Sequence, residues 1–251
     1  MNIWYMNGAG NSFAVLDARY ENTDMSRMAI DLCQSKGCDG FMALENSSVA
    51  DFKLNFYNAD GSRAEMCGNG ARCICRFAYE NKIAGEKMTV ETDAGIVFGE
   101  RISESVYKVR LNTPQNIILN KKEGLDYAVV GVPHAAIRLE TLEWSDAKGL
   151  FQRARELRHE LNANINFYSN IDANTVRILT YERGVENFTL ACGTGSSALA
   201  SILWKRKRFN GGALTVENRG GDLKITVISD GEEITELYLE GATEILSKFE
   251  Y

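Results

Sequence analysis

The 251-residue sequence has few of the residues and segments that several common classes of protein require. It contains only two histidines, His134 and His159, and no paired C-x-x-C pattern, which argues against a zinc site. No apolar run approaches the roughly 20 residues of a membrane-spanning helix. The N-terminus has no basic region followed by an apolar core, so no secretory signal is predicted and a cytoplasmic location is expected.

Basic residues are fewer than acidic residues. The chain has 28 Lys and Arg against 34 Asp and Glu, and the net charge of −6 argues against nucleic acid or an anionic membrane surface as the main partner. A basic run, KRKR at residues 205–208, precedes Asn210 and two glycines, and we interpret it as a helix end, where cations complement the helix dipole. The expected partner is therefore a small molecule; the assembly state is left open, with a homodimer as one option.

One short motif occurs twice in the sequence. A cysteine, a glycine-rich turn and a helix-like run occur as MCGNGAR at residues 66–72 and ACGTGSS at residues 191–197. Each copy follows a tyrosine with polar residues, at 57–61 and 181–184, and precedes a strand-like run, at 88–91 and 214–217. Tyr57 and Tyr181, Cys67 and Cys192, and Thr89 and Thr215 are 124, 125 and 126 residues apart. This spacing indicates a duplication of whole domains, because solenoid repeats run to roughly 20–50 residues.

The domain boundary is predicted near the midpoint. Only two prolines occur, and Pro114 follows a strand-like alternation at residues 106–111. A content of 45% hydrophobic residues is enough to fill two cores. We expect residues 1–113, completed by the last residues from 244 to 251, to form an N-terminal domain and residues 114–243 to form a C-terminal domain.

The six cysteines have several interpretations; they are Cys33, Cys38, Cys67, Cys73, Cys75 and Cys192. An even number is compatible with disulfides, but a chain of this length without a secretory signal does not need them, so reduced thiols are expected. The spacing of Cys67, Cys73 and Cys75 matches no common zinc pattern, so no metal is expected. Cys73 and Cys75 fall inside the helix predicted after Cys67, where small buried cysteines are common.

Cys67 and Cys192 would most simply be buried residues as well. Each, however, precedes Gly-x-Gly at the start of a predicted helix, where unpaired N–H groups and the positive end of the dipole lower a thiol pKa and bind an anion. Two such sites around one amino acid would stabilise negative charge on its α-carboxylate while one thiolate removes the α-proton and the other thiol delivers a proton. This is racemase or epimerase chemistry that needs no pyridoxal phosphate or other cofactor.

The sequence resembles the diaminopimelate epimerase family of cofactor-independent amino-acid racemases. Beside the two cysteine motifs, the matching segments lie at residues 7–13, 58–62, 131–134, 164–167, 181–184 and 239–241. The resemblance implies an α+β fold of two similar domains, each a strand barrel around a central helix, with the active site in the cleft between them. It also implies epimerisation of LL-diaminopimelate to the meso form, which in the family feeds lysine and peptidoglycan synthesis.

The resemblance also assigns roles to residues. It makes Cys67 and Cys192 the acid–base pair and places His134 and Glu182 near the reacting centre. Donors to the α-carboxylate are expected from Gly68, Asn69, Gly193 and Thr194. The distal end of the substrate is expected to contact Asn11, Asn58, Asn164 and Arg183. A structural role remains the alternative for His134, and an interdomain salt bridge is the alternative for Arg183, whose guanidinium suits a distal carboxylate.

The substrate has two further interpretations. Val132 stands where the family has an asparagine, Ser12 where it has an aspartate, and the segment before Asn164 is short. These departures keep open a histidine racemase, or another amino-acid racemase on the same scaffold. A remoter alternative is an amino-acid-binding protein without catalytic activity, against which the two intact cysteine motifs argue.

Overall fold

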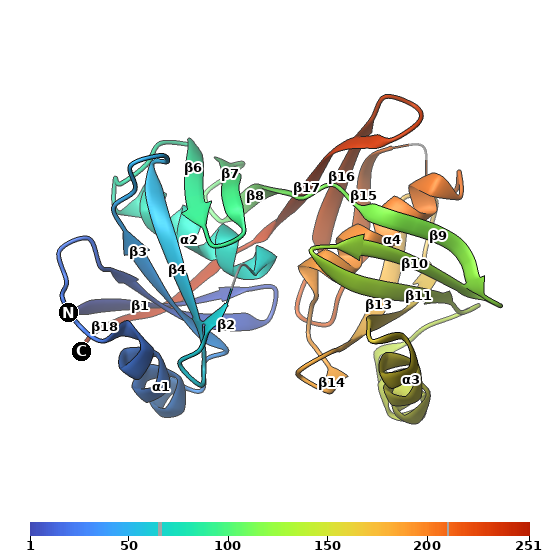
Figure 1. The fold of residues 1–251 in the computed structure, drawn as a ribbon, viewed down its shortest axis with the longest axis horizontal. Coiled ribbons are helices and arrows are strands. Elements are labelled where there is room, and N and C mark those ends of the chain that lie inside the picture. The colour runs from blue at the N-terminus through green and yellow to red at the C-terminus, as the bar shows by residue number, and fades with distance from the viewer. Residues whose placement is uncertain (65–66, 210) are drawn as a thin grey trace. The chain divides into compact units, whose positions relative to one another are not determined.

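The computed structural model describes residues 1–64, 67–209 and 211–251; Met66 of the first motif and Asn210 of the predicted helix end lie outside them. The chain divides into two compact units (Figure 1). Unit 1 comprises Met1–Val109 and Gly241–Tyr251, and unit 2 comprises Arg110–Glu240. The first division falls inside the strand at 106–111, whereas the sequence analysis places it just after that strand.

In unit 1 the strands pair in the order β18, β1, β2, β3, β4, β6, β7 and β8, with β5 beside β4. The pairs β2–β3 and β4–β6 are parallel, so each needs a crossover, and α1 and α2 provide them. The elements are β1 (Asn2–Gly8), β2 (Asn11–Asp17), α1 (Met25–Lys36), β3 (Gly40–Glu45), β4 (Phe52–Asn58), β5 (Arg63–Ala64), α2 (Gly68–Glu80), β6 (Lys87–Thr92), β7 (Gly95–Arg101), β8 (Val106–Leu111) and β18 (Glu244–Glu250).

Unit 2 repeats this plan. Its strands pair in the order β9, β10, β11, β12, β13, β15 and β16, with β14 beside β13 and with parallel pairs β11–β12 and β13–β15. The elements are β9 (Gln115–Lys122), β10 (Leu125–Val130), β11 (Val132–Arg138), the 3₁₀ turn η1 (Trp144–Asp146), α3 (Ala147–Leu161), β12 (Asn164–Asn170), β13 (Thr175–Glu182), β14 (Asn187–Phe188), α4 (Gly193–Lys205), β15 (Gly212–Glu217), β16 (Leu223–Ser229) and β17 (Ile234–Ala242). The matching order confirms the α+β fold with an internal duplication.

The second helix of each unit is its core. In α2, residues 68–78 are all buried, and the helix packs against β1, β2, β3 and β7 (Figure 1). In α4 nearly the whole helix is buried against β9, β10, β11, β12 and β16. Both helices carry small residues in their first turns, where glycine and alanine let the surrounding strands approach closely. Each cysteine motif therefore opens a helix that is enclosed by strands.

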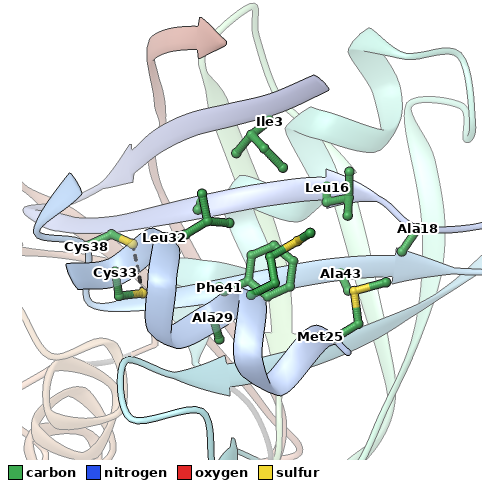
Figure 2. Close-up of a cluster of buried hydrophobic side chains, with 12 residues drawn as sticks. Ile3, Leu16, Ala18, Met25, Ala29, Leu32, Cys33, Cys38, Phe41 and Ala43 are labelled. Atoms are coloured by element: carbon green, nitrogen blue, oxygen red, sulfur yellow. Dashed lines mark hydrogen bonds between the residues drawn. The ribbon is translucent and has the colours of Figure 1, made fainter. Parts of the chain in front are cut away.

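The first helix of each unit covers the outside of the sheet. In α1, the N-cap Asp24 accepts a hydrogen bond from the Arg27 N–H, and Gly37 ends the helix in the left-handed conformation. Its apolar face packs on β1, β2 and β3 in the cluster drawn in Figure 2. The equivalent helix α3 packs against a second cluster that includes Ile137, Phe167 and Tyr181.

Several local predictions are confirmed. Strands are found at β6 and β15 where the repeat predicts them, and α4 ends at Lys205 within the basic run. Cys73 and Cys75 are buried in α2. The chain ends meet, because β1 and β18 are antiparallel and the Met1 amino group lies 2.7 Å from the Tyr251 main-chain oxygen. No helix of the described residues is long and apolar enough to cross a membrane.

Candidate active site

Cys67 and Cys192 open their helices in the same way. Each is the N-cap residue in an extended conformation, with φ, ψ of −121°, 124° for Cys67 and −124°, 108° for Cys192. Neither side chain caps its helix. The first intrahelical bonds run from Ala71 N–H to the Cys67 oxygen, at 2.7 Å, and from Ser196 N–H to the Cys192 oxygen, at 2.9 Å. The preceding N–H groups of each first turn have no main-chain acceptor within the helix, and a helix start of this kind can bind an anion. In α4 the Gly195 N–H contacts the Cys192 thiol itself.

The glycine two residues into each helix lies in close packing, which is tightest at Gly195. A Cβ on Gly195 would lie 2.6 Å from Asn166 Oδ1 and 3.2 Å from Thr180 Oγ1. A Cβ on Gly70 would lie 3.2 Å from Met42 Sδ. Since the atoms beside Gly195 belong to buried side chains, a larger residue would displace the first turn of α4. Gly195 therefore fixes the position of the α4 start within unit 2.

In unit 1, Asn11 and Asn69 meet at the start of α2. Asn69 is buried, and its Nδ2 donates to Asn11 Oδ1 at 2.7 Å. Arg72 Nη2 donates to Asn69 Oδ1 at 3.0 Å, which fixes the orientation of that amide. Both ends of the Asn69 side chain are therefore engaged within unit 1.

Asp39 holds the segment that carries Asn11. Its Oδ2 accepts from the Ser12 N–H at 2.8 Å and lies 3.5 Å from Asn11 Nδ2. The Asp39 N–H donates to the Ser12 main-chain oxygen at 2.9 Å. Asn58 is placed differently: it is exposed, and its Nδ2 donates to Ser62 Oγ at 2.9 Å in the turn after β4. Among the described residues, the hydrogen bonds of Asn58 do not include Asn11 or Asn69.

In unit 2 a chain of polar groups leads from the sheet to Cys192. Asn166 Nδ2 lies 3.3 Å from His134 Nδ1, and His134 Nε2 lies 3.0 Å from Thr194 Oγ1. Thr194 Oγ1 is in turn 3.5 Å from Cys192 Sγ. Since Asn166 can only donate through Nδ2, this network assigns the imidazole proton to Nε2, which donates to Thr194. The parallel pairing of His134 with Asn164 brings the β11 and β12 side chains together.

His134 is fully buried, and its pKa is lowered to about 3, first by burial and then by the positive charge of Arg183. The imidazole is therefore neutral near pH 7. A neutral ring of fixed tautomer can hold the Thr194 hydroxyl in one orientation, but it is a poor proton source at that pH.

Glu182 also contacts Cys192. Burial raises the pKa of Glu182, while hydrogen bonds with Thr189 and Cys192 oppose the rise. The pKa of Cys192 is raised well above its ordinary value, first by burial and then by the charge of Glu182, whereas contacts with Thr194 and the Gly195 N–H act against the rise. The expectation that the helix start lowers the pKa of both thiols is therefore wrong for Cys192. The helix contributes donors, but burial beside a carboxylate outweighs them.

Asn164 and Arg183 are joined through the main chain. Asn164 Oδ1 accepts from the Arg183 N–H at 2.8 Å, and Asn164 is buried. The Arg183 side chain is exposed and reaches the Asn162 main-chain oxygen, 3.4 Å from Nη1. Asn164 thus fixes the turn from which Arg183 projects, while the guanidinium keeps most of its donors for another partner.

Comparison with known proteins identifies the relationship. The family model for diaminopimelate epimerase matches residues 3–110 and 127–246, one stretch in each half. The chain belongs to the diaminopimelate epimerase family. It is 34% identical over 266 residues to the diaminopimelate epimerase of Aquifex aeolicus, covering 96% of this chain and 94% of that protein. It is also 34% identical over 260 residues to that of Archaeoglobus fulgidus, covering 92% and 90%.

Solved structures with the same fold are more distant in sequence. A PhzF-family phenazine biosynthesis protein from Bacillus anthracis superposes with a TM-score of 0.75 at 17% identity, covering 100% of this chain and 98% of that one. A hydroxyproline epimerase from Agrobacterium vitis superposes with a TM-score of 0.73 at 15% identity, covering 99% and 90%. These likenesses show the fold, and the closer sequence relatives show that this family member is an isomerase.

The sequence reasoning missed several polar residues that this epimerase-family fold places at the two helix starts. They are Asp39, Arg72, Asn166, Thr180 and Thr189. Asn166 lies inside a segment that matches the family, so a closer reading of that segment would have found it. Asp39 has no such signal, because it meets Ser12 only through the pairing of β2 with β3.

Proposed function

We propose that this chain epimerises LL-diaminopimelate to meso-diaminopimelate, with Cys67 as the base and Cys192 as the acid on opposite faces of the α-carbon. The observation that carries the proposal is the duplicated helix start, in which each half offers one sulfur and a set of N–H donors in the same conformation. Full-length relatives named diaminopimelate epimerase support the choice of substrate.

The first requirement is to hold the α-carboxylate. In the proposal the N–H groups of Gly68 and Asn69 and those of Gly193 and Thr194 bind its oxygens. As the α-proton leaves, negative charge builds up on this carboxylate, and helix N-termini stabilise that charge more in the transition state than in the ground state. No electron-withdrawing cofactor is then needed.

The two thiols start in different states. Burial and the neighbouring Glu182 both raise the pKa of Cys192. Cys192 therefore keeps its proton and enters the cycle as the acid. Cys67 enters as the thiolate and takes the α-proton of the LL substrate, and the buried Arg72 guanidinium in the first turns of α2 favours negative charge there. Cys192 then gives its proton to the opposite face. The product is inverted at the α-carbon, and the two thiols have exchanged protonation states.

His134 and Glu182 position the acid in this scheme. His134 contacts Thr194, Thr194 Oγ1 lies 3.5 Å from Cys192 Sγ, and Glu182 contacts Cys192. Two polar groups therefore orient Cys192 Sγ for proton transfer. Neither residue has to exchange a proton with the substrate.

The distal end of diaminopimelate carries a second amino acid group. Arg183 suits its carboxylate, because a guanidinium donates two parallel N–H bonds to such a group, and Asn11, Asn58 and Asn164 supply amide groups for the remainder. The exposed guanidinium and the main-chain bond from Asn164 support this assignment.

One residue favours a second substrate. Val132 begins β11, two positions before His134, and is half-buried. Its apolar side chain stands where the family has an asparagine, which favours a substrate with a less polar distal end, such as histidine. The chemistry at the α-carbon would be the same.

An exchange experiment tests the function directly. The purified protein is incubated in deuterated water with LL-diaminopimelate and, separately, with each of a panel of L-amino acids, and α-deuterium is measured by mass spectrometry. Deuterium in diaminopimelate together with inversion supports the proposal. Exchange in histidine alone would assign the enzyme to histidine racemisation, and exchange in no substrate would leave a binding protein. Activity that survives hydroxylamine would show that no pyridoxal phosphate takes part.

A further inference from the structure

Two cysteines away from both helix starts lie side by side. Cys33 Sγ in the last turn of α1 is 2.9 Å from Cys38 Sγ, just before β3 (Figure 2). The reversal of the chain between them is built by Gly37, which has φ of +69° and donates its N–H to the Cys33 main-chain oxygen at 2.8 Å. The close approach is thus a consequence of how the helix ends.

The pair is enclosed in the core of unit 1. Each cysteine is 5% exposed, within the cluster that also contains Leu32 and Phe41. Such enclosure keeps bulky reagents out and leaves access only to a small oxidant. It also keeps each sulfur close to the other, so that an oxidised sulfur meets a thiol at once.

The two sulfurs are not equivalent. The pKa of Cys38 is lowered, first by its hydrogen bond with Cys33 and then by the N–H groups of Ala14, Cys38 and Gly40, although burial opposes the shift. The same hydrogen bond and burial raise the pKa of Cys33. Three main-chain N–H groups thus contact the Cys38 sulfur and stabilise negative charge on it, which makes Cys38 the better nucleophile of the pair.

We propose that Cys33 and Cys38 form a redox modification site that a hydroperoxide converts to an intramolecular disulfide. The Cys38 thiolate attacks one oxygen of hydrogen peroxide, the O–O bond breaks, and the leaving hydroxide takes up a proton to become water. The Cys33 sulfur then attacks the Cys38 sulfenic acid, the S–O bond breaks, and the Cys33 proton leaves with the hydroxyl as a second water. Two thiols are oxidised and one peroxide is reduced to two waters.

The bond fits the fold. A disulfide has an S–S distance of about 2.05 Å, so the sulfurs need to approach by less than about 1 Å. The residue after Cys38 is Asp39, which holds Ser12 and Asn11. We infer that this displacement is transmitted through Asp39 to Asn11. This second step rests on the proposed function, because Asn11 is assigned to the substrate there.

Trypsin offers a direct test, because Lys36 lies between the two cysteines and cleavage there separates them. The native protein is treated with hydrogen peroxide, quenched, alkylated with N-ethylmaleimide in denaturant and digested. We expect peptides 28–36 and 37–53 to appear linked and to separate on reduction. Cys73 and Cys75 are internal controls: burial raises the pKa of each to about 12, so both should be recovered alkylated. Complete alkylation of Cys33 and Cys38 after peroxide would overturn the proposal.

Two variants test the order of the steps. In Cys33→Ser, dimedone should trap a sulfenic acid on Cys38, because the second thiol is missing. In Cys38→Ser, Cys33 should remain a thiol under the same treatment. The reverse pattern, or sulfinic acid on Cys38 without any disulfide in the wild type, would show that the pair does not work as proposed.

Steady-state kinetics test the coupling to Asn11. For the oxidised wild type we expect KM for diaminopimelate to rise roughly fivefold, the effect of weakening one hydrogen bond. Loss of the catalytic thiols to peroxide lowers Vmax but leaves the KM of the surviving enzyme unchanged. The Cys33→Ser/Cys38→Ser variant should show no KM change after peroxide. If the disulfide forms but KM is unchanged, the coupling to Asn11 is refuted and the redox site is not. If the reduced wild type has no epimerase activity, the proposed function is refuted, while the detection of the linked peptides still supports the redox site.

Discussion

Arg72 and Ser197 occupy the same position in the two halves, five residues after Cys67 and Cys192, and each donates to the main-chain oxygen of the first residue of its helix. Arg72 Nη1 lies 3.3 Å from the Gly68 oxygen, and Ser197 Oγ lies 2.9 Å from the Gly193 oxygen. The duplication has thus kept the side-chain contact at the helix start but not the charge of the donor. The donor in α2 is a buried cation, and the donor in α4 is a neutral hydroxyl.

This difference predicts how the two thiols react. In a Cys192→Ala background, Arg72→Met should require a higher pH for alkylation of Cys67 by iodoacetamide, because the variant removes the buried positive charge from the first turns of α2. Each pH unit of displacement corresponds to roughly a tenfold slower reaction at neutral pH. Arg72→Lys, which keeps the charge, is the control. Equal pH midpoints for the methionine and lysine variants would show that Arg72 acts only in packing.

Both cysteines should be indispensable for inversion. Cys67→Ala and Cys192→Ala each remove the single proton carrier on one face of the α-carbon, so epimerisation should fall by a factor of about 10²–10⁴. Cys73→Ala, at a buried cysteine of the same unit, is the matched control for the loss of a thiol. Circular dichroism checks the fold and optical rotation follows the inversion. Near-normal turnover in either alanine variant would refute the two-thiol mechanism.

The sequence was sufficient for the repeated parts of the molecule. The similar sequence separations of Tyr57 from Tyr181 and of Cys67 from Cys192 predicted the duplication. The Gly-x-Gly turns predicted where both buried helices begin. These features are local, since a turn, a helix start and a strand alternation each depend on residues close together in the chain. The same holds for the α4 end at Lys205.

Contacts that depend on strand register could not be read from the sequence. Asp39 meets Ser12 because β2 and β3 pair in parallel with Phe13 opposite Gly40, and His134 meets Asn166 because β11 and β12 pair with His134 opposite Asn164. A shift of one residue would turn these side chains to the other face of the sheet. The raised pKa of Cys192 also depends on a tertiary contact, because Glu182 is ten residues earlier in the chain.

The neutral state of His134 should be visible in the pH dependence of stability. Its pKa is about 3 in the folded protein and near 6.5 when unfolded, so below pH 6.5 the unfolded state binds a proton that the folded state does not. This contribution to stability is complete above pH 6.5 and is lost as the pH falls toward 3. By pH 4.5 the loss amounts to about 2–3 kcal/mol.

Thermal unfolding of the wild type and of His134→Gln from pH 7.5 to 4.5 measures this effect, since glutamine does not titrate. The Tm of the wild type should fall more steeply toward acid than that of the variant. His159→Gln, at an exposed position on α3, should follow the wild type. Parallel curves for the wild type and His134→Gln would mean that His134 is protonated in the folded protein.

The substrate assignment depends most on Arg183. If diaminopimelate is the substrate, Arg183→Met leaves its distal carboxylate without a charged partner, and losing such a pair costs about 2–5 kcal/mol of binding or transition-state stabilisation. At about 1.4 kcal/mol per tenfold, kcat/KM on diaminopimelate should fall by a factor of roughly 30 or more. Histidine has no distal carboxylate, so activity on histidine should change far less.

Arg155→Met, at an exposed arginine of α3, controls for the loss of a surface charge. Both substrates are to be measured with all three proteins. A wild type that prefers histidine, or an Arg183→Met variant that keeps its diaminopimelate activity, would overturn the substrate assignment while leaving the two-thiol chemistry intact.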